Sequence, residues 1–265
     1  MMRDLGKGAA ALQAPGPLVT VITVTFNAAE TIQDTLDTLA QQEFREFELV
    51  VVDGASTDET VDIIRRNGEA LPCINLLSEP DCGLYDAMNK GIARAHGQYV
   101  IFINSGDGLA DAHVLADFAQ LLSMSQQAPT IVYGHTLIEF QNGSVFLRRV
   151  RNLEYIWHGQ PTLHQSVFFS LAAHQRHRYP YERYKISADY AVMAEMQLEE
   201  TARTLLWDRV VSRFSNNTAS VSNRNLWSRI SEAWSIQRTI LGVPLPHRAF
   251  SAVRRLATNL YYNYR

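Results

Sequence analysis

The feature that most constrains the fold is the alternation, over the first hundred residues, of short apolar runs with segments of helical periodicity. In chain order, the expected strands and intervening helices are Leu18–Phe26, Thr31–Gln42, Glu48–Val52, Asp58–Asn67, Ile74–Leu77, Tyr85–His96 and Gln98–Asn104. Short runs that are apolar on both faces are typical of strands buried between helical layers. Strands alternating with helices pair in parallel through right-handed crossovers. The sequence therefore predicts an α/β fold with a mainly parallel sheet.

Composition limits the protein class. With 265 residues, 46% of them hydrophobic, the chain can bury the core of one large domain. A net charge of −3 argues against a nucleic-acid partner. Cys73 and Cys82 form no disulfide framework and fit a reducing compartment, and the longest apolar run, Tyr99–Ile103, is far too short to span a membrane. We therefore expect a cytoplasmic protein, with residues 1–17 as a flexible lead-in because they contain no signal-peptide core.

The pattern changes after Thr130. Ile131–Phe140 and Ser144–Arg149 flank an Asn-Gly turn, which predicts a β-hairpin. Gln165–Ser170 is typical of another strand and Ala188–Leu198 of a helix. Near the start of the chain, Ser56 and Glu59 have the spacing of a capping box for the helix Asp58–Asn67.

Polar residues follow the strands of the predicted sheet. Asp53, Asp81 and Asp107 each come directly after one strand, and Thr25 to Asn27 ends another. Each aspartate alone is also an ordinary turn or cap residue. Ligands of open α/β sheets bind at the carboxyl ends of the strands, and three carboxylates gathered there would repel one another without a cation or hydrogen-bond donors between them.

Two phosphate-binding motifs are missing. The chain has neither a Gly-x-Gly-x-x-Gly after its first strand nor a Gly-x-x-x-x-Gly-Lys-Ser/Thr anywhere. A divalent metal held by a carboxylate is another way to bind phosphate, and Mg²⁺ is commonly held by one or two carboxylates together with substrate phosphates. Asp107, in a glycine-flanked turn, is the expected ligand for Mg²⁺ or Mn²⁺.

Several segments together resemble the family 2 glycosyltransferases. They are Val21–Asn27, Val51–Thr60, Ser78–Ile92 and Gly97–Asp107, followed by His164–Phe169 and Tyr184–Tyr190, which resemble acceptor-side segments of bacterial surface-polysaccharide members of the colanic-acid type. The matches occur in the family's order and cover residues 18–195.

The resemblance implies a GT-A fold, in which a Rossmann-like nucleotide-sugar half (residues 18–108) is fused to an acceptor half (109–223), with helices at the C-terminus. It also implies inverting transfer of a sugar from a nucleotide-diphosphate sugar to a hydroxyl of a glycan or lipid-linked acceptor. A sugar-phosphate nucleotidyltransferase fits less well because its glycine-rich loop and lysine are absent after the first strand. A catalytically inactive nucleotide-sugar binder or assembly protein is a further alternative.

The resemblance also implies roles for particular residues. Those expected at the nucleotide sugar are Thr25, Phe26, Asn27, Asp53, Asp81, Gly83, Asn89, Ser105 and Gly106. Asp107 matches the last acid of the family's Asp-x-Asp, whereas Ser105 stands where a first aspartate is common.

Transfer to a hydroxyl needs a base, and the resemblance places Asp189 in that role. The alternative is that Asp189 or Ser187 caps the following helix. His164 and Gln165 are expected to contact the acceptor or the diphosphate, although an isolated histidine is more often structural.

The tail, residues 224–265, carries seven arginines and one glutamate. Trp227, Ile230, Trp234 and Leu241 predict one apolar stripe, and a break from Gly242 to Pro246 precedes a second helix. Such a tail suits an anionic membrane surface at the inner face of the cell membrane. Alternatively, the stripe packs on the catalytic domain and the arginines face water.

Overall fold

The computed structural model describes residues 16–68, 70–216 and 226–263. Residues 1–15 of the expected lead-in, 217–223 of the expected acceptor half, and 224, 225, 264 and 265 of the expected tail lie outside the described residues.

The first half of the chain forms the predicted parallel sheet. Its strands are β1 (Val19–Thr25), β2 (Phe47–Asp53), β3 (Ile74–Ser78) and β4 (Tyr99–Phe102), and its helices are α1 (Ile32–Ala40), α2 (Thr60–Arg66) and α3 (Leu84–Arg94). The four strands lie in the order β3-β2-β1-β4 and every neighbouring pair is parallel. The predicted α/β alternation is confirmed.

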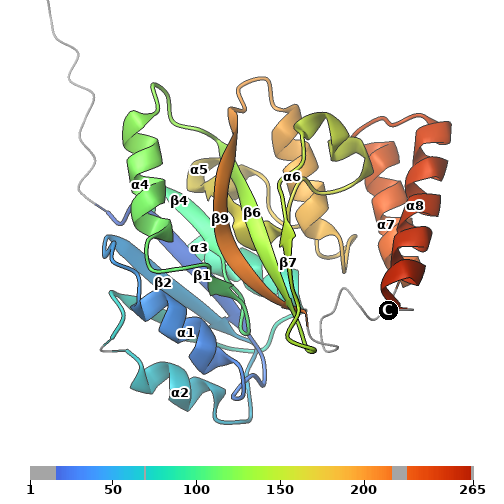
Figure 1. Ribbon diagram of the computed structural model, residues 1–265. Coiled ribbons are helices and arrows are strands. Elements are labelled where there is room, and N and C mark those ends of the chain that lie inside the picture. Colours follow the sequence, from blue (N-terminus) through green and yellow to red (C-terminus); the bar gives the residue numbers. More distant parts are fainter. Residues whose placement is uncertain (1–15, 69, 217–225, 264–265) are drawn as a thin grey trace, which may run out of the picture.

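Helices cover both faces of this sheet (Figure 1). Alternate residues of β1 point to opposite sides, so Val19 and Val21 pack in one core cluster with Leu36 of α1, whereas Ile22 packs in the other with Met88 of α3. All seven residues of β1 are buried, as are all seven of β2. Burial on both faces explains why these strands do not alternate between apolar and exposed polar residues, and the threonines of β1 and Glu48 of β2 are buried as well.

The second half extends the same sheet. Its strands are β5 (Gly108–Leu109), β6 (Ile131–Phe140), β7 (Val145–Arg148), β8 (Val167–Ser170) and β9 (Thr204–Asn216). Antiparallel β8 joins β4 to β6, parallel β9 follows β6, and β5 pairs with the far side of β9. β7 pairs with β6 as the predicted hairpin. The fold is therefore a mixed α/β sheet in which one half runs into the other without a break.

Helices and short 3₁₀ turns complete this half. They are α4 (Val114–Met124), η1 (Leu153–His158), η2 (His164–Ser166), α5 (Leu171–Arg176) and α6 (Ala188–Leu198). α6 has the predicted bounds, whereas α4 and β9 were not predicted. Strand β9 carries Asp208, Arg209 and Arg213, and these charges interrupt the apolar pattern of a strand.

The predicted capping box is wrong. α2 begins at Thr60 after Glu59, which makes no side-chain cap bond, and the Thr60 N–H donates to Asp58 Oδ1 at 3.1 Å. The Ser56 hydroxyl donates a hydrogen bond to Asp53 Oδ1 and accepts one from the Asn27 N–H at 2.8 Å. The Ser56 hydroxyl is therefore hydrogen-bonded to Asp53 and Asn27, whereas the local pattern assigned it to the cap of α2.

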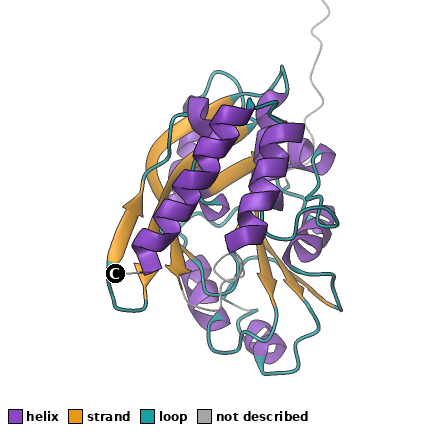
Figure 2. Ribbon diagram, turned by 90° about the vertical axis from the view of Figure 1, so that its right-hand side faces the viewer, coloured by secondary structure: helices purple, strands orange, loops and turns teal. Residues whose placement is uncertain are grey.

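The tail forms the predicted helices, α7 (Leu226–Thr239) and α8 (Leu245–Asn263), which lie side by side at the outside of the molecule (Figure 2). Ala233 and Ile236 of α7 are buried in the core, and Leu241 packs against it beyond the end of the helix. The predicted stripe is wrong at Trp227, whose side chain is 70% exposed. Within the described ranges, no helix is both long and apolar enough to cross a bilayer.

Candidate active site

The loops after β1, β2 and β3 converge at the carboxyl edge of the sheet. A Cβ at Gly54 would lie 2.6 Å from Asp81 Oδ2 and 3.3 Å from Phe26 Cδ2, so only glycine allows this close approach. Phe26 is 62% exposed although it follows a buried strand, whereas Thr25 is buried with a hydroxyl oxygen that has no hydrogen-bond partner. The structure thus brings Thr25, Phe26 and Asp81 together, with an aromatic face turned to solvent.

Asp53 ends β2 and is fully buried. Its carboxylate accepts hydrogen bonds from the Ser56 N–H at 3.0 Å, from the Ser56 hydroxyl and from the Ser78 hydroxyl at 2.6 Å. These bonds fix the loop after β2 and connect it to the end of β3.

Asn27 connects the loops after β1 and β2. Its N–H donates to the Ser56 hydroxyl, and its Oδ1 accepts from the Thr57 N–H at 2.9 Å. The residue has a φ of 45°, which asparagine tolerates better than most residues. Beside it, Asp81 Oδ1 accepts from the Gly83 N–H at 2.7 Å, so this pair orders the turn into α3.

The structure places Asn89 away from these loops. Its side-chain amide donates to the Tyr179 carbonyl and accepts from the Tyr179 N–H, each at 2.9 Å. It lines a separate surface cavity of about 460 Å³ together with Lys90 and Tyr181. The pairing ties α3 to the acceptor half.

The turn from Ser105 to Asp107 is fastened to α1. The Ser105 hydroxyl lies 3.1 Å from that of Thr31, the Gly106 N–H donates to the Thr35 hydroxyl at 2.9 Å, and that hydroxyl donates to the Asp107 carbonyl at 2.7 Å. The Ser105 hydroxyl thus helps to hold the turn against Thr31. Thr31, at the N-cap of α1, and Thr35 in α1, which the sequence did not single out, position the turn.

The Asp107 side chain is 7% exposed and accepts one side-chain hydrogen bond, from Gln165 Nε2 at 2.9 Å. Burial raises the pKa of Asp107 to about 7, although the bond from Gln165 acts in the opposite direction. A nearby positive charge would stabilise this buried carboxylate, because burial without such a charge favours the neutral carboxylic acid.

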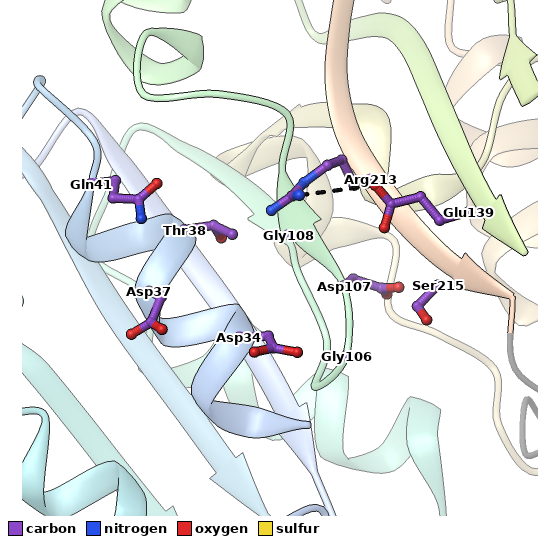
Figure 3. A pocket seen from close by; sticks show the side chains of 10 residues that line it. All are labelled: Asp34, Asp37, Thr38, Gln41, Gly106, Asp107, Gly108, Glu139, Arg213 and Ser215. Carbon is purple, nitrogen blue, oxygen red and sulfur yellow. Dashed lines mark ion pairs between the residues drawn. The ribbon is translucent and has the colours of Figure 1, made fainter. Parts of the chain in front are cut away.

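Asp107 lines a groove of about 300 Å³ between α1 and the ends of β6 and β9 (Figure 3). The other lining residues are Asp34, Asp37, Thr38 and Gln41 of α1, Gly106 and Gly108 of the turn, and Glu139, Arg213 and Ser215 of the strands. Arg213 Nη1 lies 3.8 Å from Glu139 Oε1. Sequence patterns did not point to the α1 and strand residues, and Asp53 and Asp81 are not part of this lining.

Asp189 lies in the first turn of α6, on the acceptor side. Its Oδ1 accepts from the Tyr190 N–H at 2.8 Å and lies 3.1 Å from the Tyr85 hydroxyl, which also lies 2.7 Å from the Ile186 carbonyl. These two acceptors compete for one hydrogen. Ser187, at the N-cap position, makes no side-chain cap bond, so the cap expected from Ser187 is not formed, whereas Asp189 itself accepts from the first-turn N–H of Tyr190.

Tyr85 is a site residue that sequence reasoning missed, although it stands inside one of the matched segments. Burial and the Asp189 carboxylate raise its pKa well above the usual value, so the hydroxyl keeps its proton. The ring is stacked on Tyr179 at 5.3 Å between centroids, which holds the hydroxyl against Asp189.

His164 and Gln165 connect the two carboxylates. His164 Nδ1 lies 3.7 Å from Asp189 Oδ2, while Gln165, the next residue, bonds Asp107. Burial lowers the pKa of His164 despite the neighbouring Asp189, so its ring is neutral at neutral pH. His164 Nε2 is buried and has no hydrogen-bond partner. One short turn, η2, therefore contacts both acids and leaves one ring nitrogen available.

Comparisons with known proteins identify the family and the fold of the chain. The model of the family "Glycosyl transferase family 2" matches residues 20–183. A "PGL/p-HBAD biosynthesis glycosyltransferase" of Mycobacterium bovis is 33% identical over 160 residues, which is 58% of this chain and 59% of the length of that relative. The chain thus spans less than two thirds of this curated relative.

Two solved structures have the same fold. Staphylococcus aureus TarS (residues 1–349, with UDP-GlcNAc) superposes with a TM-score of 0.68 at 21% identity, covering 90% of this chain and 71% of TarS. The mannosyltransferase PcManGT of Pyrobaculum calidifontis, with GDP-Man and Mn²⁺, gives 0.63 at 19% identity, covering 93% and 76%.

Proposed function

The chain belongs to glycosyl transferase family 2, and from that premise we propose that it moves a sugar from a nucleotide-diphosphate sugar to a hydroxyl of a glycan or lipid-linked acceptor in cell-surface glycan synthesis. Inverting transfer needs a base at the attacking hydroxyl and neutralisation of charge at the departing diphosphate. The observation that carries the proposal is the η2 turn, whose consecutive residues His164 and Gln165 contact Asp189 and Asp107.

On the donor side, Phe26 offers an exposed ring on which a nucleobase could stack, next to the Asp81 carboxylate. Thr25 and Asp53 lie at the adjacent strand ends, and Gly83, Ser105 and Gly106 lie in the loops that border them. We assign these residues to the nucleotide sugar. Asn89 would act indirectly, by holding α3 in place through Tyr179.

The residues present fit a divalent metal. No cluster of three His, Cys, Asp or Glu ligands occurs in the described part of the chain, but Mg²⁺ and Mn²⁺ sites that share their ion with a diphosphate need only one or two carboxylates. Asp107 would hold the ion, because it is a buried carboxylate with one neutral side-chain donor and a raised pKa. When bound, the metal supplies Lewis-acid stabilisation of the diphosphate leaving group.

On the acceptor side, Asp189 would accept the proton of the attacking hydroxyl, an effect typically worth about 10²–10⁴ in rate. Tyr85 and the Tyr190 N–H hold the carboxylate in place by hydrogen bonds. The neutral His164 ring excludes water from one side of Asp189 and presents Nε2 to the acceptor or the diphosphate.

The first test is donor binding. In a thermal-shift series with UDP-GlcNAc, GDP-mannose and other nucleotide sugars, we expect one donor to raise the unfolding temperature in Mn²⁺ and much less in EDTA. A ligand at one hundred times its Kd adds about 2.7 kcal/mol to the free energy of unfolding. A flat response to every donor would contradict the proposal.

The second test separates binding from transfer. Asp189→Asn should leave donor binding unchanged and lower the release of nucleoside diphosphate, measured with a lipid-linked glycan fraction as acceptor, by about 10²–10⁴. Turnover close to that of the wild type would remove Asp189 from the role of base. A protein that binds donor but never turns over would be an inactive nucleotide-sugar binder.

We also propose that the tail brings the enzyme to the inner face of the cell membrane. Leu245, Phe250 and Val253 of α8 are 59%, 60% and 64% exposed, and Trp227 of α7 is 70% exposed. An outward apolar face on an arginine-rich helix pair is typical of peripheral binding to anionic lipid. The alternative that the apolar stripe packs on the catalytic domain fits Leu241, which packs against the core, but not Trp227, which is 70% exposed.

Sedimentation with vesicles of phosphatidylcholine and phosphatidylglycerol tests this. Phe250→Ser with Val253→Ser should reduce the bound fraction severalfold, whereas Val145→Ser, which changes an equally exposed valine of β7, should not. Equal sedimentation of wild type and double variant would exclude the α8 face.

A further inference from the structure

Two arginines from distant parts of the chain face one point in the acceptor half. Arg151 follows β7 and Arg255 lies in α8, and both approach Gly159 at the end of η1. A Cβ at Gly159 would lie 3.1 Å from Arg255 Nη2 and 3.4 Å from Arg151 Nη2. Glycine, with a φ of +151° here, thus leaves room for two like charges at one place.

The hydrogen bonds of these guanidinium groups go to neutral partners. Arg151 donates to the Gln160 carbonyl and lies 3.4 Å from His158 Nδ1, and Arg255 Nη2 donates to the His158 carbonyl at 2.8 Å. Arg255 Nε is buried without a partner. Within the described ranges, neither Arg151 nor Arg255 forms an ion pair with a carboxylate.

Other partly buried arginines of this chain are neutralised. Arg209, whose side chain is 22% exposed, contacts Asp111 at 2.7 Å and Asp117 at 2.8 Å, and even the exposed Arg176 contacts Glu199 at 3.0 Å. Buried charges in proteins are ordinarily paired, because an uncompensated one is costly to remove from water. The pair at Gly159 departs from that rule.

The electrostatic surroundings are consistently positive. Burial, together with Arg148 and Arg254, lowers the pKa of Arg151 to about 10, and burial also lowers that of Arg255. Burial and the nearby arginines lower the pKa of His158 to about 4. At neutral pH both arginines stay charged while His158 is neutral, so the site has a net positive charge.

We propose that Arg151 and Arg255 form an anion site for a phosphate or diphosphate group, separate from the donor diphosphate at Asp107. Planar guanidinium groups bind phosphate oxygens in a bidentate manner, and Nε–H with Nη–H is the edge they use. The unpartnered Nε of Arg255 belongs to that edge.

The position of the site identifies its ligand as part of the acceptor, an inference that rests on the proposed function. His164 is the fifth residue after Gly159, so the Cα atoms of these two residues lie at most about 18 Å apart. The anion site is built from η1 and α8, and α8 carries the apolar face assigned to the membrane. An acceptor with a phosphate near its reactive sugar would reach both places.

The test is binding of inorganic pyrophosphate to the full chain in EDTA, measured by calorimetry. Without metal, the Asp107 carboxylate repels the anion, so the donor site contributes little. We expect Arg151→Gln and Arg255→Gln each to weaken binding at least tenfold and Asp107→Asn not to weaken it. Arg45→Gln is the matched control, because Arg45 also donates to two carbonyls, those of Ala40 and Ala70, but lies on the other half.

Lysine variants guard against loss of folding, which circular dichroism would report. Arg151→Lys and Arg255→Lys keep the charge but lose the bidentate edge, so they should bind with intermediate affinity. A second arm uses phosphatidylcholine vesicles with and without phosphatidic acid. Arginine-dependent binding of pyrophosphate identifies a phosphate that reaches the site from solution, and arginine-dependent binding only to the acidic vesicles identifies a lipid headgroup.

Pyrophosphate and vesicle binding that are both unchanged in the glutamine variants would overturn the proposal, since the arginines would then only hold the carbonyls of η1. Because these measurements need neither donor nor transfer, their failure is distinct from failure of the proposed function. A chain without glycosyltransferase activity that still bound pyrophosphate through Arg255 would retain the site and lose only its assignment to the acceptor.

Discussion

Asp53 and Asp107 stand at the carboxyl ends of strands on either side of β1, yet their surroundings differ. Asp53 is fully buried and accepts three hydrogen bonds from Ser56 and Ser78. Asp107 is almost as buried but accepts fewer hydrogen bonds, one from Gln165 Nε2 and one from the Ser215 backbone, and burial raises its pKa to about 7. The first carboxylate is satisfied by its own chain and shapes a loop, whereas the second still needs a partner.

The sharpest way to test this difference is Asp107→Asn. A carboxyl whose pKa is higher in the folded than in the unfolded state stabilises the fold at low pH, and this contribution is lost as the pH rises from about 4 through 7. In EDTA, the free energy of unfolding of the variant should therefore rise relative to wild type by about 2–4 kcal/mol between pH 4 and pH 8.

Urea unfolding at several pH values measures that difference. Asp34→Asn, which changes an exposed acid of the same groove, should show no such trend. A wild-type minus Asp107→Asn difference that is independent of pH would mean that folding does not raise the pKa of Asp107.

The hydrogen bonding of Asp53, the other carboxylate of the comparison, is tested by Ser78→Ala. Removing the hydroxyl takes one of three donors from a buried carboxylate, and hydrogen bonds to charged groups are worth about 1.5–3 kcal/mol. We expect a loss of about 2 kcal/mol in the free energy of unfolding at pH 7. Ser125→Ala, which removes a bond to the Leu121 carbonyl, is the control and should cost less than half as much.

The smallest expected effect is that of Phe26→Ala. Because the ring is 62% exposed, its removal should hardly change stability. Loss of stacking on a base should nevertheless weaken donor binding roughly tenfold, or about 1.4 kcal/mol. Calorimetry with the donor found in the thermal-shift series would show this, and an unchanged Kd would mean that the base lies elsewhere.

The sequence predicted the first half of the fold well, because its strands are short, mostly apolar runs that alternate with segments of helical periodicity. Strand β9 was missed since Arg209 and Arg213 break its pattern, and its place beside β6 depends on contacts seventy residues away. Ser56 was misread because a local motif cannot show that Asp53 and Asn27 compete for the same hydroxyl.

The candidate site also contains residues that the sequence could propose and residues that only distant contacts reveal. Residues inside matched segments, such as Asp107 and Asp189, could be named from the sequence, and the structure shows that η2 connects them. The Tyr85 contact could not be foreseen, because it joins residues more than one hundred positions apart. Arg151 and Arg255 are likewise separated by most of the acceptor half, and no local pattern distinguishes them from surface arginines.

The nine strands of the described residues form one sheet, and β8 joins the strands of the first half to those of the second. Cutting the chain between the halves would leave β4 with a bare edge and strip β8 of half its hydrogen bonds, so neither piece should persist alone. We infer that donor loops and acceptor helix melt in a single cooperative transition. A destabilising change far from the chemistry then lowers the population of complete catalytic centres without altering their geometry.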